Sequence, residues 1–405
     1  MARAAQVDPV GKPRRVLVIV ENLPVPFDSR VWSEATTLAA AGYHVSVICP
    51  RGEGYEARYE LIDGIAIYRH PLPRDARGRF AYLIEYGAAT TCQFLLTCWI
   101  FLRRGFDVIH ACNPPDTIFL VAAFFRLFGR RLVFDHHDPS PELYAVKFSR
   151  RDVFYRLLLR LQRRSFRSAD VVITTNESQR RLAIERAGVP AQRLFVVRSG
   201  PRLERIHGVA PNPSLRHGRK FLVGYVGLMS RQDGIHLLLE AARRIVHDIG
   251  RADVQFCLAG DGPELTSLRN LSAAYRVSDY VTFCGRLEGR DLLELISTAD
   301  VCVNPDEVNE LSNLCTTIKV MEYMALGKPV VQFDSTEGRI SAQDASLYAR
   351  PNDAEDFAAK IVALLDDAEL RRVMGERGRE RVRSQLAWTH QVPKLLAAYD
   401  AVFRA

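Results

Sequence analysis

The chain has 405 residues, of which 48% are hydrophobic and 25% are charged. These proportions are ordinary for a globular protein and exclude disordered or collagen-like chains, and the length accommodates two or three domains of about 100–200 residues each. The net charge of +8 is uneven, because residues 1–200 carry 29 Lys and Arg against 19 Asp and Glu, whereas residues 201–405 carry 26 against 28. The first half is therefore expected to face something anionic, such as nucleic acid, a membrane surface or a phosphorylated lipid.

The cysteines and the start of the chain bear on its compartment. None of the eight cysteines lies in a CxxC or Cys/His spacing that binds metals, and most lie inside apolar runs. We therefore expect reduced cysteines in the core and a cytoplasmic protein. Residues 1–15 are polar and lead into a predicted strand, so no signal peptide is expected. Polar residues interrupt the apolar stretch Phe80–Leu102, which favours a buried or interfacial helix over a membrane-spanning one.

Short β-branched runs alternate with helical patterns in the first half. Strands are predicted at Arg15–Val20, His44–Cys49, Ile65–His70, Asp107–Ala111, Arg131–Phe134, Val171–Thr174 and Leu194–Arg198. Helices are predicted at Arg30–Ala41, Phe80–Arg103, Asp116–Leu127, Asp152–Ser168 and Glu177–Ala187. Apolar strands separated by helices are typical of a parallel sheet covered on both faces.

The alternation stops at residues 201–220, which contain prolines and no sustained apolar period. It resumes with strands predicted at Phe221–Val226, Val254–Ala259, Val281–Cys284, Val301–Val303, Pro329–Phe333 and Leu347–Ala349. The helices predicted there are Ile235–Val246, Glu264–Tyr275, Asp291–Ser297, Thr317–Ala325, Ala354–Leu365, Glu369–Ser384 and Thr389–Val402.

The pattern predicts an α/β protein of two tandem, doubly wound, Rossmann-like domains that face each other across a cleft. The domains are residues 1–200 and 221–385, with a linker at 201–220, and residues 386–405 are expected to form a helix that packs back toward the first domain. Ligands of such sheets bind beyond the carboxyl ends of the strands. Two facing carboxyl edges would hold a donor and an acceptor, which suits group transfer.

The segment Val301–Phe333 carries the clearest chemistry. A strand ends in a polar loop, and a helix then begins near Thr317. The free N–H groups of a helix start attract phosphate, and Thr316, Thr317 and Lys319 add hydroxyl donors and a charge. Glu322, one turn further on, has the spacing to accept hydrogen bonds from ribose hydroxyls. The alternative interpretation is a capped helix with a solvated Lys and a solvated Glu.

Three runs in the second half resemble the family-four glycosyltransferases, which have the GT-B fold. MEYMALGKPVV at Met321–Val331 is similar to their donor-binding signature. LAGDGPE at Leu258–Glu264 and VTFCGRL at Val281–Leu287 are similar to the segments that contact the nucleobase. The resemblance covers nearly the whole chain and implies sugar transfer from a nucleotide diphosphate sugar with retention of anomeric configuration. It places Gly227, Gly285 and Arg286 in the donor site and implies that no metal and no cofactor is needed, because the helix dipole and cations stabilise the leaving diphosphate.

Two departures from the family pattern affect the expected donor site. Leu314 stands where the first Glu of a Glu-x7-Glu pair is expected, and Glu307, Glu310 and Asn313 are the neighbouring candidates for contacts with the sugar. The turn at Gly227–Gly234 also lacks the family's Arg and Lys. Leu228 and Asp233 take those places, which leaves Arg231 and Lys319 as the candidate cations for the diphosphate.

The acceptor side is expected in the first domain. Asp28, Ser29 and Arg30 stand where the family has a Gly-Gly loop; Asp28 is equally well interpreted as a helix N-cap, and Arg30 as a contact for a phosphate across the cleft. FDHHDPSPELY follows a strand, and the resemblance implies that His137 faces the sugar, with Asp138 and Glu142 nearby. Adjacent histidines at a strand end are not expected in the core. Four consecutive potential ligands, residues 135–138, would diverge on an extended backbone, so no metal site is predicted.

Lys147–Arg167 is predicted to form a basic amphipathic helix. It contains eight basic residues and one acid, and Arg156, Arg160, Arg163 and Arg167 recur at helical spacing. Such a helix can lie on anionic lipid. The alternative is an ordinary helix that covers the sheet and has a solvated Arg face. Nucleic acid is disfavoured because no basic sheet with interleaved aromatic residues and no known docking module is present.

The sequence thus predicts a hexosyl-type glycosyltransferase in which His137, Glu322 and Lys319 carry catalysis. Its partners are a nucleotide sugar and a saccharide or lipid-linked acceptor for surface-polysaccharide synthesis, at the inner face of the cell membrane. Two alternatives remain: a nucleotide-sugar epimerase of the same fold, and a non-catalytic glycosyltransferase-like binding subunit.

Overall fold

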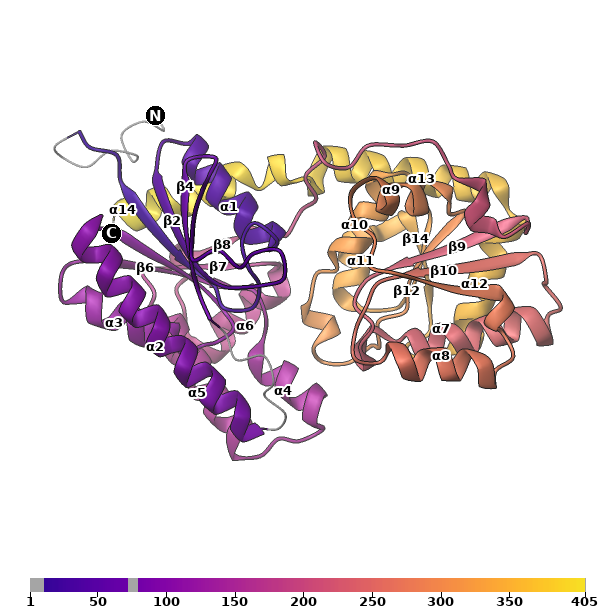
Figure 1. Cartoon of the computed structure of the whole chain (residues 1–405), viewed down its shortest axis with the longest axis horizontal. Coiled ribbons are helices and arrows are strands. Elements are labelled where there is room, and N and C mark those ends of the chain that lie inside the picture. The colour runs from indigo at the N-terminus through magenta and orange to yellow at the C-terminus, as the bar shows by residue number, and fades with distance from the viewer. Residues whose placement is uncertain (1–10, 72–78, 405) are drawn as a thin grey trace. The chain divides into compact units, whose positions relative to one another are not determined.

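The computed structural model describes residues 11–71 and 79–404, so the polar start of the chain at residues 1–10 lies outside the described residues. The chain divides into two compact units, each of which is described by itself (Figure 1). Unit 1 comprises the chain up to Arg198 together with the segment from Gln391 onward, and unit 2 is Ser199–His390.

Unit 1 is built on an eight-stranded sheet of order β3-β4-β2-β1-β5-β6-β7-β8. All pairs are parallel except β3 with β4. Its central strands are buried almost throughout, as expected of a sheet covered on both faces. The strands are β1 (Arg15–Ile19), β2 (His44–Pro50), β3 (Tyr59–Ile62), β4 (Ile65–His70), β5 (Val108–Cys112), β6 (Arg131–His136), β7 (Val171–Thr174) and β8 (Leu194–Val196).

Seven helices of unit 1 are described, and the last of them comes from the far end of the sequence. They are α1 (Ser29–Ala40), α2 (Arg79–Arg103), α3 (Ile118–Arg126), α4 (Ser140–Phe148), α5 (Val153–Ser168), α6 (Glu177–Ala187) and α14 (Val392–Arg404). The yellow helix α14 contacts α1 and strands β6 to β8 (Figure 1). The fully buried Tyr399 anchors it, because its hydroxyl lies 2.8 Å from Nδ1 of His110 in β5.

Unit 2 has a six-stranded, all-parallel sheet of order β11-β10-β9-β12-β13-β14. Its strands are β9 (Phe221–Val226), β10 (Val254–Ala259), β11 (Val281–Gly285), β12 (Val301–Asn304), β13 (Val330–Phe333) and β14 (Ser346–Ala349). Its helices are α7 (Ile235–Arg243), α8 (Leu265–Ala274), α9 (Gly289–Thr298), α10 (Ile318–Ala325), α11 (Thr336–Ala342), α12 (Ala354–Asp366) and α13 (Ala368–Arg381). Residues that alternate along the strands enter two separate cores, for example Leu222 in one and Val223 in the other, so both faces of the sheet are covered.

Residues 201–220, expected as a linker, belong to unit 2. Leu203, Ile206, Val209 and Leu215 pack against the core that contains Leu222, which explains why this proline-containing stretch is held on the unit.

Three short elements were not predicted, namely β3, α4 and α11. Each is four to nine residues long, too short for a sequence period to develop.

Two expectations from the sequence concern the cysteines, expected to be reduced, and the long helix α2, not expected to span a membrane. All eight cysteines are free thiols, and Cys49, Cys112, Cys257 and Cys302 are buried. Among the described residues, no helix combines the length and the apolar character needed to cross a bilayer, and this includes α2.

Candidate active site

The first turn of α10 is fixed at the carboxyl edge of the sheet of unit 2. Strand β12 ends at Asn304, a loop follows, and α10 begins at Ile318. The buried Tyr323 locks the helix to the end of β9, because its hydroxyl accepts from the backbone N–H of Val226 at 2.8 Å and lies 3.3 Å from the Val226 carbonyl oxygen. A ligand at this edge therefore meets the amino terminus of the helix.

The residue at the start of α10 does not cap the helix with its side chain. Thr317 occupies the N-cap position without a side-chain hydrogen bond, and no acidic residue lies in the first turn. By contrast, Asp28, Asp353 and Asp367 cap α1, α12 and α13 with their carboxylates. The partial positive charge of the first N–H groups of α10 is therefore not compensated by the side chain of the N-cap residue, which is the arrangement that binds phosphate.

Lys319 is charged and already paired with acidic residues. Its Nζ donates to Asp306 at 2.8 Å, lies 3.9 Å from Asp233, and stands 4.8 Å from the centre of the Tyr225 ring. Burial opposes the charge, but Asp306, Tyr323 and Asp233 outweigh it and raise the pKa of Lys319. A diphosphate at this edge must therefore compete with two carboxylates for this ammonium group.

Glu322 lies one turn along α10 and is half-buried. Burial raises the pKa of its carboxyl. Within 11–71 and 79–404, no group forms a hydrogen bond with its side chain. The oxygens that the sequence assigned to ribose hydroxyls are thus not engaged by neighbouring residues.

Three glycines follow successive strands at the same edge. A Cβ atom on Gly227 would lie 2.6 Å from the Tyr225 hydroxyl, and one on Gly260 would lie 1.8 Å from the Gly227 carbonyl oxygen. The Gly260 N–H donates to the Gly285 carbonyl at 2.8 Å, which joins the third turn to the other two. Backbone therefore lines this edge where side chains do not fit, and a ligand can approach it closely.

The remaining predicted donor residues are spread around this edge. Arg231 is exposed in the turn after β9, and Arg286 is exposed and paired with Glu288 at 2.5 Å. Glu310 is exposed, and Thr316 and Thr317 are half-buried.

Asn313 has a structural contact instead. Its side-chain oxygen accepts from the N–H of Thr336 at 2.8 Å, so this oxygen is already engaged with the first residue of α11. Leu314 is half-buried in the same short turn, and the structure offers no carboxylate at that position.

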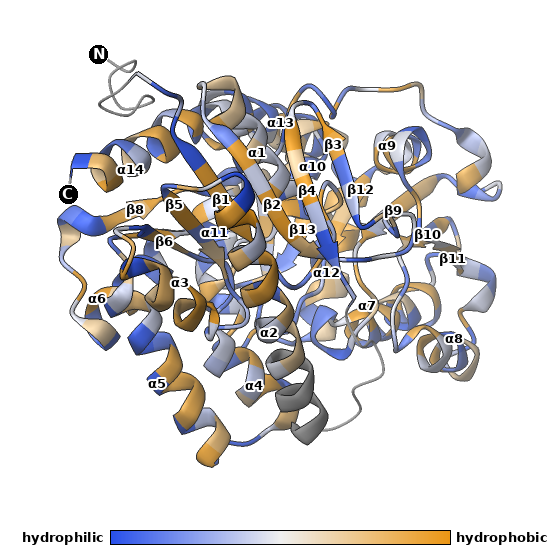
Figure 2. Ribbon diagram, turned by 60° about the vertical axis from the view of Figure 1, so that its left-hand side comes forward, coloured by the Kyte–Doolittle hydropathy of each residue, from blue (hydrophilic) through white to orange (hydrophobic). Residues whose placement is uncertain are grey.

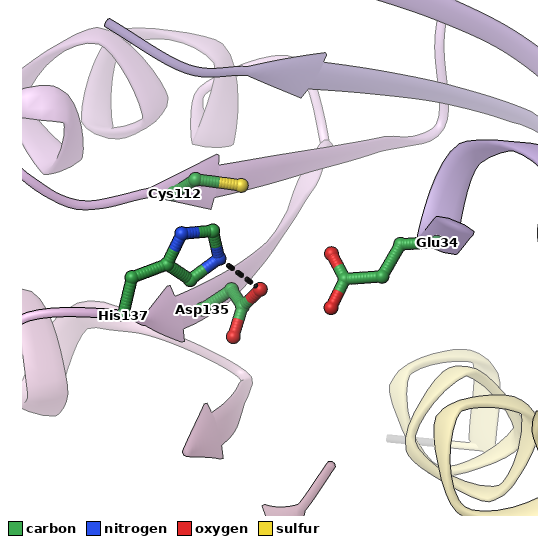
Figure 3. A group of neighbouring side chains, drawn as sticks. All are labelled: Glu34, Cys112, Asp135 and His137. Atoms are coloured by element: carbon green, nitrogen blue, oxygen red, sulfur yellow. Dashed lines mark hydrogen bonds and ion pairs between the residues drawn. The ribbon is translucent and has the colours of Figure 1, made fainter. Parts of the chain in front are cut away.

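In unit 1, the buried carboxylate of Asp135 near the end of β6 organises the predicted acceptor side. It accepts from Nε2 of His137 at 2.6 Å (Figure 3). It also accepts from Nη2 of Arg30 at 2.9 Å, and Nε2 of His110 lies at 3.4 Å. Burial by itself would raise the pKa of Asp135, but the charges of Arg30 and His137 and the two histidine hydrogen bonds lower it well below its ordinary value. Asp135 is therefore an anion that orients His137.

Glu34 of α1 reaches the same cluster and was not predicted. Its Oε1 lies 3.0 Å from Nη2 of Arg30, and its carboxylate faces Asp135 and His137 in Figure 3. Burial, together with the charge of Asp135, raises the pKa of Glu34 well above its ordinary value. One guanidinium thus lies between two buried carboxyl groups, at 3.0 Å from Glu34 and 2.9 Å from Asp135.

Arg30 is not available to a phosphate of an acceptor, which corrects the expectation for this residue. It is only 7% exposed, and it also donates to the carbonyl of Val197 at 2.8 Å. Glu142 is likewise buried and forms an ion pair with Arg186, so it is a structural residue. The side chain of Asp28 accepts from the N–H of Val31 at 3.0 Å, which is the N-cap interpretation.

The two adjacent histidines lie on opposite sides of the chain, because successive side chains of an extended backbone point in opposite directions. His136 is buried between Gln179 and Gln162, and burial lowers its pKa to about 4, so the expectation that neither histidine belongs to the core is wrong for His136. His137 is half-buried beside Asp138. Burial raises the pKa of Asp138 although His137 lowers it, and the nearby charge of Asp28 raises it further.

Glu34, Cys112, Asp135 and His137 bring potential metal ligands within 4.8 Å of one another (Figure 3). Asp135 and His137 converge because they are two residues apart, so the expected divergence of residues 135–138 does not hold for this pair. The guanidinium of Arg30, bonded to Asp135 and close to Glu34, already provides the positive charge that an ion would bring. Independence from metals stays a prediction.

Asn113 and Asp116, which were also not predicted, hold the loop after β5 against His137. The side-chain oxygen of Asn113 accepts from the N–H of His137 at 2.7 Å, and its amide donates to Asp116 at 3.1 Å. Asp116 is buried, its Oδ2 has no partner among the residues described, and burial raises its pKa to about 7. The only sequence signal was an Asn-Pro-Pro-Asp turn after a strand.

Comparison with known proteins agrees with this geometry. Residues 28–200 match the family model "Glycosyl transferase 4-like domain" and residues 220–367 match "Glycosyl transferases group 1". The chain therefore belongs to the family-four glycosyltransferases of the GT-B fold.

Individual relatives differ in what they act on. The chain is 27% identical to alpha-D-kanosaminyltransferase of Streptomyces kanamyceticus over 76% of its own length and 80% of that protein. It is 29% identical to a GDP-mannose-dependent monoacylated alpha-(1-6)-phosphatidylinositol monomannoside mannosyltransferase of Corynebacterium glutamicum, but over only 37% of its own length and 39% of that protein. Sucrose-phosphate synthase from Thermosynechococcus elongatus has the same fold, with a TM-score of 0.79, 21% identity and coverage of 94% of this chain and 96% of that one.

The buried charges of unit 1 predict a large cost for removing Arg30. The variant Arg30→Met leaves an uncompensated buried carboxylate at Asp135 and should destabilise unit 1 by about 3–5 kcal/mol. Hydrogen exchange of the α1 and β6 amides under urea measures this. Arg372→Met, which breaks an exposed pair with Glu369, serves as the control and should leave stability unchanged. Equal stability of Arg30→Met and wild type would show that the ion pair is not the organising contact.

The raised pKa of Asp116 predicts a pH-dependent loss of stability. The carboxyl group is neutral in the fold up to about pH 7 but ionises near pH 4 when the chain is unfolded. The free energy of unfolding is therefore highest at low pH and falls until the pH has risen through 7. Asp116→Asn removes this dependence. From pH 5 to pH 8, the free energy of unfolding of unit 1 should fall by about 2 kcal/mol more in wild type than in the variant. Urea unfolding midpoints measured at each pH give this difference. Parallel pH profiles for the two proteins would contradict this assignment.

Proposed function

We propose that the chain is a retaining, metal-independent glycosyltransferase whose donor is a nucleotide diphosphate sugar bound at the carboxyl edge of unit 2. The observation that carries this proposal is the start of α10, where Thr317 makes no side-chain cap and Lys319 lies in the first turn. A leaving diphosphate gains negative charge in the transition state, and fixed N–H dipoles and an ammonium group stabilise that charge. The glycine turns allow the nucleotide to approach the backbone.

Lys319 takes over the role of the two cations that the turn after β9 lacks. Its Nζ lies 3.2 Å from the place that a Cβ of Gly227 would occupy, so its charge reaches this turn although it belongs to α10. Asp233, which stands where the family has a cation, accepts from the hydroxyl of Ser230 at 2.5 Å, and burial raises its pKa. Donor binding then moves Lys319 from Asp306 to a phosphate oxygen.

The acceptor hydroxyl is assigned to His137 of unit 1. Asp135 accepts from Nε2 of this histidine, which leaves Nδ1 as the other ring nitrogen, and the side chain is 13% exposed. Asp138 adds a second polar group at this position. The acceptor that we propose is a lipid-linked glycan used in surface-polysaccharide synthesis, and the mannosyltransferase relative named above acts on a phosphatidylinositol mannoside.

Helix α5 supports a location at an anionic membrane surface. Arg156, Arg160, Arg163 and Arg167 are all exposed, whereas Gln162, Ser165 and Phe166 face the interior. Each basic residue near an anionic surface contributes about 1 kcal/mol. Four of the basic residues in the first half of the sequence thus lie on one exposed helix face.

Substitutions in α10 test the donor site. Lys319→Ala and Glu322→Ala should each lower the transfer rate by about 100-fold or more, the effect typical of removing one charge-stabilising group. Calorimetry with a panel of nucleotide sugars should show weaker binding in both variants. Lys360→Ala changes a lysine of α12 whose side chain is 38% exposed; it is the matched control and should behave as wild type.

His137→Ala completes this series, because it should abolish transfer yet keep donor binding, which belongs to unit 2. Unchanged transfer in Lys319→Ala and Glu322→Ala would refute the donor site. Isomerised free nucleotide sugar without acceptor would instead identify an epimerase, and the absence of any nucleotide-sugar binding would identify a non-catalytic subunit.

Vesicle sedimentation tests the membrane surface. The triple variant Arg156→Ala, Arg160→Ala, Arg163→Ala removes about 3 kcal/mol of attraction and should weaken binding to phosphatidylglycerol vesicles by about 100-fold. Three exposed arginines in and just after α13 provide a control of equal charge change, in the triple variant Arg372→Ala, Arg377→Ala, Arg383→Ala. Equal losses in the two triple variants would assign the binding to net charge and not to α5.

A further inference from the structure

Unit 1 contains an apolar pocket of about 370 Å³ that none of the roles assigned above uses. It lies between α2, α4, α5 and the loop after β5, entirely within this unit. Six large apolar side chains of α4 and α5 line it, namely Leu143, Phe148, Phe154, Leu157, Leu158 and Leu161. Pockets of about 300–1,000 Å³ with few polar groups are typical ligand sites, and this lining fits hydrocarbon and not a sugar.

Large apolar side chains are also exposed on the three helices around this pocket. Leu102 of α2 is 83% exposed, Leu127 at the end of α3 is 80% exposed, and Val153 of α5 is 68% exposed. Helix α3 contacts both α2 and α5, and the orange stretches of these three helices in Figure 2 mark their apolar residues. Single exposed apolar residues are common, but exposed apolar residues on helices that also line an apolar pocket are typical of an interaction site.

The rim of the pocket carries positive charge. Lys147 of α4 lines the pocket and is exposed, and Arg150 and Arg151 follow it in the exposed turn before α5. An apolar interior with a basic rim complements a molecule that joins a hydrocarbon chain to an anionic head. A phosphate-bearing lipid has this chemistry. A neutral lipid lacks the anionic head, and a free saccharide lacks the hydrocarbon chain.

The pocket is joined to the proposed acceptor residue by two hydrogen bonds. Asp116 lines the pocket and receives a bond from Asn113, which in turn accepts from the backbone of His137. The Oδ2 atom of Asp116 is buried and has no partner in the described part of the chain, so a polar group of a ligand can satisfy it. The wall of the pocket at Asp116 is therefore two hydrogen bonds away from the backbone of His137.

We propose that this pocket holds the hydrocarbon tail of the acceptor lipid, with the lipid phosphate at Lys147 and the sugar acceptor directed toward His137. This inference rests on the proposed transfer to a lipid-linked acceptor and names where the lipid binds. The exposed apolar residues of α2, α3 and α5 contact the bilayer while the tail passes from the membrane into the pocket.

Gly87 of α2 allows the pocket to be filled without disturbing the fold. It lines the pocket, and a Cβ atom built on it meets no atom within 4 Å. Gly87→Phe should therefore place a ring in the cavity of the full-length protein. Ala88→Phe is the matched control, because the neighbouring residue is exposed and does not line the pocket.

Calorimetry with dodecyl phosphate, below its micelle concentration, measures the binding. Wild type and Ala88→Phe should bind it, and Gly87→Phe should bind at least tenfold more weakly. Lys147→Ala should weaken dodecyl phosphate but not dodecyl maltoside, which has the same tail and no phosphate. Farnesyl phosphate, tested in parallel, distinguishes an isoprenoid tail from an acyl tail by which of the two probes binds more tightly.

The inference is overturned if neither phosphate probe binds wild type, or if Gly87→Phe and Ala88→Phe bind equally well. Donor binding by wild type is measured separately, so the two proposals can fail independently. A protein that binds nucleotide sugars but neither probe keeps the proposed transferase function and loses the lipid pocket. A protein that binds the probes but no nucleotide sugar keeps a lipid pocket and loses the transferase function.

Discussion

The buried carboxylate of Asp135 is the group on which the organisation of unit 1 depends. It joins Arg30 of α1, His110 of β5 and His137, and His110 extends the network to Tyr399 of α14. A buried carboxylate without partners is strongly destabilising, so each of these segments is held in place by the requirement to neutralise it. The same requirement fixes the ring of His137, so that an interaction of the core determines the position of the proposed acceptor residue.

The two units use charge differently. In unit 1, one guanidinium is surrounded by two buried carboxyl groups and is not accessible to a ligand. In unit 2, the ammonium group of Lys319 is also paired with acidic residues, but it adjoins a helix start that the side chain of Thr317 does not cap. An anion can displace Asp306 there because the helix dipole adds to its attraction. This difference is the reason for assigning the donor to unit 2.

Our proposals for the pocket and for helix α5 give the charge asymmetry of the sequence a common explanation. Helix α5 supplies Leu157, Leu158 and Leu161 to the pocket and exposes its arginines on the outside. One helix can thereby attract an anionic surface and bind the tail of a lipid taken from it. Exposed apolar side chains on α2 and α3 do not stabilise the folded protein in water, but they favour contact with a bilayer.

The sequence by itself determined the two α/β units, most of their strands and long helices, and the segment that forms the edge of the donor site. These follow from local periodicity and from the motif Met321–Val331, which depend only on neighbouring residues. The tertiary structure alone decided which charged side chains are buried and which partners neutralise them. Arg30 and Glu142 looked like surface residues but are buried, because partners more than 40 residues away, Asp135 and Arg186, neutralise them. Glu34 carried no sequence signal, and Asn113 and Asp116 carried only that of an Asn-Pro-Pro-Asp turn, for the same physical reason. The burial and hydrogen bonds that define these residues come from distant segments that only folding brings together.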